Sequence, residues 1–341
     1  DAPCAQISNE FHLGSLMDFE TVYNFGKKVD LLTIEIEHVN IEALLKLEEE
    51  GLEIYPQPAV LQKIQHKGIQ KDFFVKNNIP TSPHKRFSNK KELLNENLDF
   101  PFVWKSSQFG YDGTGVKVVK NENELNSLAN EDCIVENLIP FKNELAVIVA
   151  RNKNGEIKTY PVVEMEFHKE ANQVEYVICP ARISDEVANK AREIALEVAE
   201  SFKHIGLLAV EMFQTTNDEI LVNEVAPRTH NSGHYSIEAS YTSQFEQHLR
   251  SILNLPLGNT DSKVAGIMVN LVGEVGYSGN VVYEGMEEIL KMEGVTPHIY
   301  GKKETRPFRK MGHVTIVNTD ISKARQLAEK VKNTIRVISK S

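Results

Sequence analysis

Residues Val103–Val119 read VWKSSQFGYDGTGVKVV, and this stretch is the most informative part of the chain. Three glycines fall within six residues between two predicted strands: Gly110, Gly113 and Gly115. An Asp-Gly pair alone is a common hairpin signal, so a plain tight turn and a nucleotide-binding loop both remain open. Three glycines exceed the need of one turn, and they would let backbone N–H groups close over phosphates. Lys105 ends the preceding strand, where its ammonium could meet a phosphate oxygen.

Upstream of this loop, the apolar spacing predicts an α/β unit. Val29–Glu37 is expected to be a strand, and Ile41–Glu50 a helix that ends at Gly51. A second helix is predicted over Ile69–Asn78, before a domain linker at 79–83.

Downstream of residue 100, predicted strands outnumber helices. The strands expected are Phe102–Lys105, Val116–Lys120, Cys133–Glu136, Glu144–Ala150, Tyr160–Glu164, Leu207–Phe213, Glu219–Val225, Val264–Val272 and His313–Val317. Ser184 is a suitable N-cap for a helix that runs to Phe202, and a final helix is expected from Ser322. This order does not fit one alternating parallel sheet. We therefore expect an α/β domain followed by α+β lobes.

Composition excludes several classes of function. The 341 residues carry a net charge of -10, and an acidic chain is a poor binder of nucleic acid. No apolar run approaches the roughly 20 residues that span a membrane, so neither nucleic acid nor membrane is an expected partner. Cys4, Cys133 and Cys179 are far apart and form no CxxC motif. This pattern argues against a disulfide framework or a structural zinc site and favours the cytosol.

The predicted hairpin over residues 207–225 carries two acids that would face each other. For a short turn, Glu211 and Glu224 come out nearly opposite on one face. Like charges opposed across strands destabilise a sheet unless something neutralises them. Mg²⁺ is the expected partner because it takes carboxylate oxygens together with substrate phosphates. Two solvated acids remain the alternative, and Asn223 either points to the other face or lends a further oxygen.

The next segment, NEVAPRTHNSGHY at 223–235, combines a cation with hydrogen-bonding side chains. His230 and His234 are four residues apart, which on a helix would indicate a metal pair. The intervening Asn-Ser-Gly favours a loop instead. Such a loop suits recognition of an anion and an amine.

Near the C-terminus, YGKKETRPFRKMGH at 300–313 is basic within an acidic chain. Its cations could grip a phosphate monoester, because the guanidinium fork gives bidentate contact. A solvated loop is the alternative. The residues concerned are Lys302, Arg306, Arg309 and Lys310.

With GYDGTG, NEVAPRTHNSGH and RKMGH in this order, the chain resembles the 5-(carboxyamino)imidazole ribonucleotide synthetase family of ATP-grasp enzymes. The resemblance covers essentially the whole chain. It implies an ATP-grasp fold with a Rossmann-like pre-ATP-grasp domain at 1–80, a small lobe at 81–140, a large lobe at 141–255 and a small C-terminal subdomain at 256–341. The family's first strand and its Gly-Gly-Gly-Gln-Leu-Gly type loop have no counterpart here, so the first domain is expected to be truncated at its start.

The resemblance also implies ATP and Mg²⁺ as cofactors. Glu211 and Glu224 would hold the metal, the hinge backbone at 136–139 would read adenine, and Glu144 would hold the ribose. The residues expected at the ATP site are Lys67, Lys105, Gly110, Tyr111, Asp112, Gly113, Thr114, Gly115, Val116, Glu136, Asn137, Leu138, Ile139, Glu144, His168, Asn223 and Glu224. Phe109 replaces a family glycine and Thr114 a family cation, so the loop is expected to be stiffer and to lack one positive charge.

For the second half-reaction, the resemblance implies aminoimidazole ribonucleotide and bicarbonate as substrates, in a homodimer. The catalytic residues expected are Arg228, His230 and Tyr111. The residues expected to bind substrate are Glu35, Glu37, Asn231, Ser232, Lys302, Arg306, Arg309 and Lys310.

The reaction implied is ATP-dependent carboxylation of the ribonucleotide through carboxyphosphate, a step of purine biosynthesis. Catalysis would rest on positioning and charge neutralisation in a dry site. Three alternatives remain: another ATP-grasp carboxylate–amine ligase, a non-catalytic ATP-binding module, and a zinc hydrolase built on His230 and His234.

Overall fold

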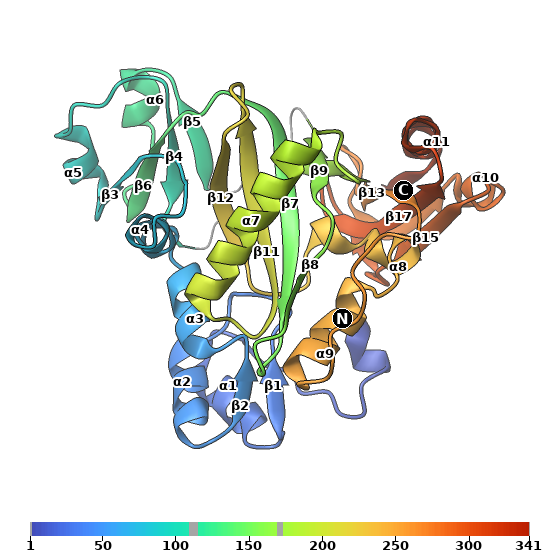
Figure 1. The fold of residues 1–341 in the computed structure, drawn as a ribbon, viewed down its shortest axis with the longest axis horizontal. Helices are drawn as coiled ribbons and strands as arrows, with labels where there is room; N and C mark the ends of the chain where they lie inside the picture. Colours follow the sequence, from blue (N-terminus) through green and yellow to red (C-terminus); the bar gives the residue numbers. More distant parts are fainter. Residues whose placement is uncertain (1, 109–114, 169–172, 341) are drawn as a thin grey trace.

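The computed structural model describes residues 2–108, 115–168 and 173–340. Figure 1 shows an N-terminal unit, a small lobe and a C-terminal region placed around one large sheet. None of the helices in these ranges has the length and apolar content needed to cross a membrane.

The N-terminal unit is a small α/β layer in which β1 and β2 pair in parallel. Side-chain caps start α1 and α2, since Asp18 accepts the N–H of Thr21 and Asn40 accepts that of Ala43. The elements are η1 (Pro3–Gln6), α1 (Phe19–Gly26), β1 (Leu31–Thr33), α2 (Ile41–Glu49), β2 (Glu53–Tyr55) and α3 (Pro58–Ile64). Helix α4 (Lys67–Lys76) then leads into the small lobe.

The small lobe is an antiparallel sheet in the order β3-β6-β4-β5. Phe102, Trp104 and Val119 pack into its core, beneath two short helices. Its elements are β3 (His84–Phe87), α5 (Lys90–Leu94), β4 (Phe102–Ser106), β5 (Val116–Val119), α6 (Glu122–Asn126) and β6 (Cys133–Asn137).

The large sheet has the order β12-β11-β7-β9-β10-β13-β17-β15, and β8 pairs with β7. Helix α7 begins at the Ser184 cap and lies across β7, β11 and β12 (Figure 1). Its apolar stripe, which includes Val187, Ile194 and Val198, is buried against them. The elements of this lobe are β7 (Phe141–Arg151), β8 (Ile157–Thr159), β9 (Val163–Phe167), β10 (Val174–Cys179), α7 (Asp185–Phe202), β11 (Gly206–Thr215), β12 (Ile220–Ala226), η2 (Asn231–Gly233), α8 (Ser236–Ala239) and α9 (Gln244–Ile252).

The C-terminal region extends the large sheet and adds a three-stranded sheet in the order β16-β14-β18. Helix α11 packs its buried Ala324, Ala328 and Val331 into the core that β13 and β17 share. The elements are β13 (Ala265–Val272), β14 (Gly279–Glu284), α10 (Met286–Leu290), β15 (Val295–Ile299), β16 (Glu304–Thr305), β17 (Lys310–Asn318), α11 (Ile321–Thr334) and β18 (Arg336–Ser339).

The expected α/β unit followed by α+β lobes is confirmed, and three local predictions need correction. The strand predicted over 29–37 is only Leu31–Thr33, because its neighbour β2 is equally short. The strand predicted from Tyr160 begins at Val163, since Pro161 lacks the N–H that a ladder needs. The segment at 79–83 is also more than a linker. Thr81 bridges to Val222 in parallel, and Val222 N–H donates to Pro80 O at 2.7 Å.

Candidate nucleotide and substrate site

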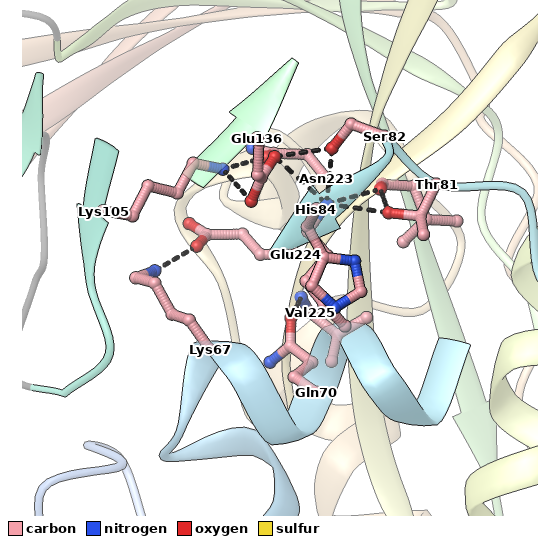
Figure 2. A network of polar contacts seen from close by, with 12 residues as sticks. Lys67, Gln70, Thr81, Ser82, His84, Lys105, Glu136, Asn223, Glu224 and Val225 are labelled. Carbon is pink, nitrogen blue, oxygen red and sulfur yellow. Dashed lines mark hydrogen bonds and ion pairs between the residues drawn. The ribbon is translucent and has the colours of Figure 1, made fainter. Parts of the chain in front are cut away.

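The hairpin of β11 and β12 brings three polar side chains to one side. Its register sets Glu211 directly opposite Glu224, as the sequence predicts. The register then shifts, so that Met212 pairs with Val222 and Asn223 is an extra residue on β12. A β-bulge of this kind re-aims side chains beside functional sites. Asn223 and Glu224 can therefore both face the small lobe, as Figure 2 shows.

Glu224 is neutralised by a lysine from α4. Lys67 Nζ lies 2.5 Å from Glu224 Oε2 (Figure 2). The charge of Lys67 is the main reason that the pKa of Glu224 falls to about 2. Glu224 is therefore fully ionised at neutral pH, within reach of a cation that could instead meet phosphate.

Glu211 has a different partner. His230 Nε2 lies 3.2 Å from Glu211 Oε1. Ser232 N–H donates to His230 Nδ1, and the Ser232 hydroxyl lies 2.9 Å from the same atom. A neutral imidazole that accepts at Nδ1 carries its proton at Nε2, so His230 donates to Glu211. Glu211, which is predicted to bind the metal, and His230, which is predicted to be catalytic, thus contact each other.

Glu144 joins these acids on the same face of the sheet. Glu211 pairs with Ala146, two residues along β7 from Glu144, and side chains two apart share a face. Burial raises the pKa of Glu144 to about 8, and the charges of Glu211 and Glu224 add to the shift. This face therefore has a negative potential that a divalent cation would relieve.

The small lobe contributes Lys105, buried at the end of β4. Its Nζ lies 2.9 Å from Asn223 Oδ1 and 3.0 Å from Glu136 Oε1 (Figure 2). Burial alone would raise the pKa of Glu136, but the charges of Lys105 and Lys71 lower it to about 2. The sequence prediction gives Glu136 a backbone role in the hinge, whereas its side chain is 3% exposed and anchors Lys105.

The connection between β6 and β7 contains the predicted hinge residues Leu138 and Ile139. Asn137 N–H donates to Pro83 O at 3.1 Å, which fixes the start of this connection. His168 follows β9, and its ring lies 6.1 Å from that of Phe308. Both rings line a cavity of about 260 Å³ together with Asn270.

The predicted phosphate loop lies mostly outside the described residues: Gly110, Tyr111, Asp112, Gly113 and Thr114, together with Phe109, are not among them. Its ends are ordered by the small lobe. Ser106 N–H donates to Gly115 O at 2.8 Å, and Val116 begins β5 opposite Lys105. Lys67 N–H donates to Ser107 O at 2.9 Å, which joins the base of this loop to α4.

The residues predicted for the second substrate lie where the N-terminal unit, the large lobe and the C-terminal region meet. Glu37 Oε1 lies 2.8 Å from Arg228 Nε, so a predicted substrate acid pairs with a predicted catalytic cation. Burial raises the pKa of the Tyr300 phenol, and the charge of the exposed Glu35 adds a smaller effect. Asn231 and Asn270 exchange two amide hydrogen bonds of 2.9 and 2.8 Å, and Ser232 is buried beside His230.

The basic segment folds back on itself. Lys302 Nζ donates to Lys310 O at 2.8 Å and lies 5.8 Å from the centre of the Tyr300 ring. Arg309 Nη1 donates to Glu304 O at 2.7 Å, and Arg306 is exposed.

A zinc site at His230 and His234 is not supported. His230 turns to Glu211, whereas His234 stacks on Phe245 and His313 and contacts Gln244. Within the described ranges, no three His, Cys, Asp or Glu side chains are grouped as a metal site.

Sequence reasoning missed two features of this region. One is Lys71, buried in α4 beside Glu136, and its spacing of four from Lys67 was the available signal. The other is a column of stacked rings that joins the two later motifs. We call it the ring column, and it consists of Phe245, His234, His313 and His298.

Three domain families match the chain in succession. Residues 1–65 match the ribonucleotide synthetase preATP-grasp domain, residues 72–245 the ATP-grasp domain, and residues 266–327 the phosphoribosylaminoimidazole carboxylase C-terminal domain.

Curated relatives fall into two groups. The N5-carboxyaminoimidazole ribonucleotide synthase of Bacillus subtilis is 38% identical over 93% of this chain and 83% of its own length. The phosphoribosylaminoimidazole carboxylase of Candida glabrata is 39% identical over 93% of this chain, but this covers only 58% of its length. The chain thus spans less than two thirds of the fungal relatives that it matches.

Solved structures agree with these matches. The N5-carboxyaminoimidazole ribonucleotide synthetase of Thermotoga maritima superposes with a TM-score of 0.91 at 43% identity, over 99% of this chain and 90% of that chain. The Aspergillus clavatus N5-carboxyaminoimidazole synthase, solved in complex with ADP and 5-aminoimidazole ribonucleotide, gives 0.88 at 32% identity, over 97% of this chain and 89% of that chain.

Proposed function

Because this chain belongs to the N5-carboxyaminoimidazole ribonucleotide synthase family of ATP-grasp enzymes, we propose that it carboxylates 5-aminoimidazole ribonucleotide with bicarbonate and ATP. The products would be N5-carboxyaminoimidazole ribonucleotide, ADP and phosphate, within purine biosynthesis.

The observation that carries this proposal is the meeting of cations and acids between two sheets. Two lysines contact the β11–β12 hairpin: Lys67 pairs with Glu224, and Lys105 donates to Asn223. Lysines that hold protein oxygens at such short range could exchange them for phosphate oxygens of ATP. Without Lys67 the opposed acids would destabilise the hairpin, so a nucleotide that drew this lysine to its phosphates would leave a place for a metal between them.

The donor set fits Mg²⁺. Glu211 and Glu224 lie on one face across the hairpin. Burial raises the pKa of the neighbouring Glu144 to about 8, and the charges of Glu211 and Glu224 add to that shift. Two carboxylates suffice for a cation that takes its remaining oxygens from phosphates and water. Bound there by Glu211 and Glu224, Mg²⁺ would neutralise charge on the transferring phosphoryl group.

The protein's own residues would then supply binding and orientation. Lys105 would hold ATP phosphate, fixed by Glu136 and Asn223. Arg228 and His230 would orient bicarbonate for attack on the γ-phosphate, and the resulting carboxyphosphate would release CO₂ beside the exocyclic amine. Lys302 and Arg309 would hold the ribonucleotide phosphate, because this family binds a substrate of that kind and both lie in the one basic segment.

One assay tests the reaction. Phosphate release from ATP is measured with bicarbonate, with and without 5-aminoimidazole ribonucleotide, on the purified chain. We expect release that requires Mg²⁺ and bicarbonate, and incorporation of ¹⁴C from bicarbonate into an acid-labile product only when the ribonucleotide is present. Release stimulated by an amino acid in place of the ribonucleotide would favour another carboxylate–amine ligase, and nucleotide binding without release would favour a binding module.

We also propose that the chain forms a homodimer in the cytosol and that its domains divide at residues 80, 140 and 255. Helix α9 and its flanks expose an apolar stripe at a spacing of four: Tyr241, Phe245, Leu249 and Leu253. Stripes of this kind commonly mark interfaces. Sedimentation of the parent and of Leu249→Glu tests the dimer, since the charge should dissociate it.

The three free cysteines support a reducing compartment.

A further inference from the structure

The buried ammonium of Lys71 makes contacts that the proposed reaction does not use. Lys71 is 2% exposed. Its Nζ donates to Thr81 Oγ1 at 2.7 Å and to Ser82 Oγ at 3.0 Å, and it lies 3.3 Å from Glu136 Oε2. Val222 O completes this shell at 3.4 Å. Burying a charged amine is costly unless it is paired and hydrogen-bonded, and here every N–H has a partner.

Glu136 links Lys71 to the nucleotide site. Its two oxygens are divided, because Oε1 faces Lys105 at 3.0 Å while Oε2 faces Lys71 and accepts from Ser82 Oγ at 2.6 Å. The carboxylate is therefore held from one side and directs its free oxygen to Lys105. Without Lys71, the Glu136 carboxylate would be free to turn both oxygens toward Lys105 and draw the Lys105 ammonium away from Asn223.

Lys71 also contacts the backbone that carries the other binding groups. It shares α4 with Lys67, one turn earlier. Its Nζ lies 3.4 Å from the carbonyl oxygen of Val222, the residue just before Asn223 on β12. The Thr81 hydroxyl donates to the same oxygen at 2.6 Å. A single ammonium on α4 thus contacts the 79–83 segment, β6 and β12.

We propose that Lys71 is a positioning residue for ATP binding: through the divided carboxylate of Glu136, it holds Lys105 where Lys105 meets phosphate. This inference rests on the proposed nucleotide site. It predicts that the charge of Lys71 matters to ATP affinity, beyond the packing of α4.

The test compares Lys71→Gln and Lys71→Arg with the matched control Lys76→Gln, an exposed lysine of the same helix. Glutamine can still donate to the two hydroxyls but carries no charge. Affinity for a non-hydrolysable ATP analogue is measured calorimetrically with Mg²⁺, beside the KM values for ATP and ribonucleotide and the melting temperature. We expect Lys71→Gln to weaken analogue binding about tenfold or more, as loss of a charge-assisted contact does. The KM for ribonucleotide should stay within about threefold on the same scale.

Lys71→Arg should recover most of the affinity, and Lys76→Gln should match the parent. Parental analogue affinity in Lys71→Gln overturns the inference, as does an equal loss for both substrates that arginine does not rescue, since that result means a structural role. If Lys71→Gln does not fold, Glu136→Gln replaces it and should weaken analogue binding in the same selective way. If the parent binds the analogue but shows no bicarbonate-dependent release, the proposed reaction fails while the positioning role is still decided by binding.

Discussion

Lys67 Nζ and Glu224 Oε2 lie 2.5 Å apart although 157 positions separate the two residues in the chain. The pair spans the interface between α4 and β12, and it neutralises one of two acids that the hairpin sets face to face. Among the described residues, Glu211 is contacted by His230, whose Nε2 lies 3.2 Å from Glu211 Oε1. Lys67 therefore balances part of the negative charge of this acid pair, and a phosphate that drew this lysine away would leave the two carboxylates free to hold a metal.

Lys67→Met should change the affinities for nucleotide and metal in opposite directions. ATP should bind about tenfold to a hundredfold more weakly, because one charge-assisted contact is lost. Mn²⁺ without nucleotide should bind more tightly, because Glu211 and Glu224 are left as uncompensated carboxylates. Electron paramagnetic resonance measures free Mn²⁺ directly, and calorimetry measures ATP. Lys63→Met, in the neighbouring helix α3, serves as control. Weaker binding of both ligands would mean that Lys67 only supports the fold.

Sequence reasoning recovered the hairpin and the order of its acids because alternation in strands has a period of two. It could not foresee the bulge at Asn223, since one extra residue leaves no mark in an alternating pattern. This bulge is what lets Asn223 reach Lys105 while Glu224 reaches Lys67. Lys71 was missed for a related reason: a lysine in a helix is read as solvated, and only tertiary packing buries it.

The ring column could not be predicted from the sequence either. The motifs around His234 and His313 are 79 residues apart. His313 lies on β17 opposite His298 of β15, and His234 lies just before α8, which packs against β17. Ring centroids are 4.8 Å apart for His234 and His313 and 4.5 Å apart for His313 and His298. Motif matching predicted that both segments serve the substrate, but it gave no contact between them.

Acid should destabilise the protein partly through His313. Burial, with a smaller effect from His298, lowers the pKa of His313 from 6.5 to about 3. The unfolded chain therefore binds more protons between these two values, so stability rises with pH across this window. The contribution is fully present above pH 6.5 and is lost as pH falls toward 3.

His313→Phe keeps a ring in the column but removes this titration. Its melting temperature should fall less steeply than that of the parent between pH 6.5 and 4, although at pH 7.5 the lost Tyr300 hydrogen bond costs about 1 kcal/mol. The slope should not vanish, because the pKa values of buried His204 and His248 are also lowered, to about 4. The exposed His12, replaced by Gln, is the control and should keep the parental slope. An unchanged slope in His313→Phe would show that this ring is not buried as a neutral group.

Arg309→Ala should raise the KM for the ribonucleotide and leave ATP affinity nearly intact. Its Nη1 donates to Glu304 O, and the guanidinium has five N–H donors in all, so further donors can meet a phosphate. The loss should be about 1.5–3 kcal/mol, the worth of a hydrogen bond to a charged group. Steady-state kinetics with each substrate varied in turn measures it, with the exposed Lys303→Ala as control. Equal effects on both substrates would assign the basic segment a structural role.

Glu224→Gln separates a metal site from a pair of structural acids. Two opposing effects act on stability without ligand: relief of the contact with Glu211 gains about 0.2–1 kcal/mol, and loss of the Lys67 pair costs a similar 0–1 kcal/mol because Glu224 is 38% exposed. The melting temperature without nucleotide should therefore hardly change.

Phosphate release should fall about a hundredfold or more, since removing one charge-stabilising contact at a transferring phosphoryl group costs roughly 3 kcal/mol. Mg²⁺·ATP should raise the melting temperature less than in the parent, because stabilisation follows affinity. Glu219→Gln, an exposed acid at the turn of the same hairpin, should behave as the parent in all three measurements. Near-parental turnover in Glu224→Gln would contradict the metal assignment, because a carboxamide cannot replace the charge that the paired carboxylates supply.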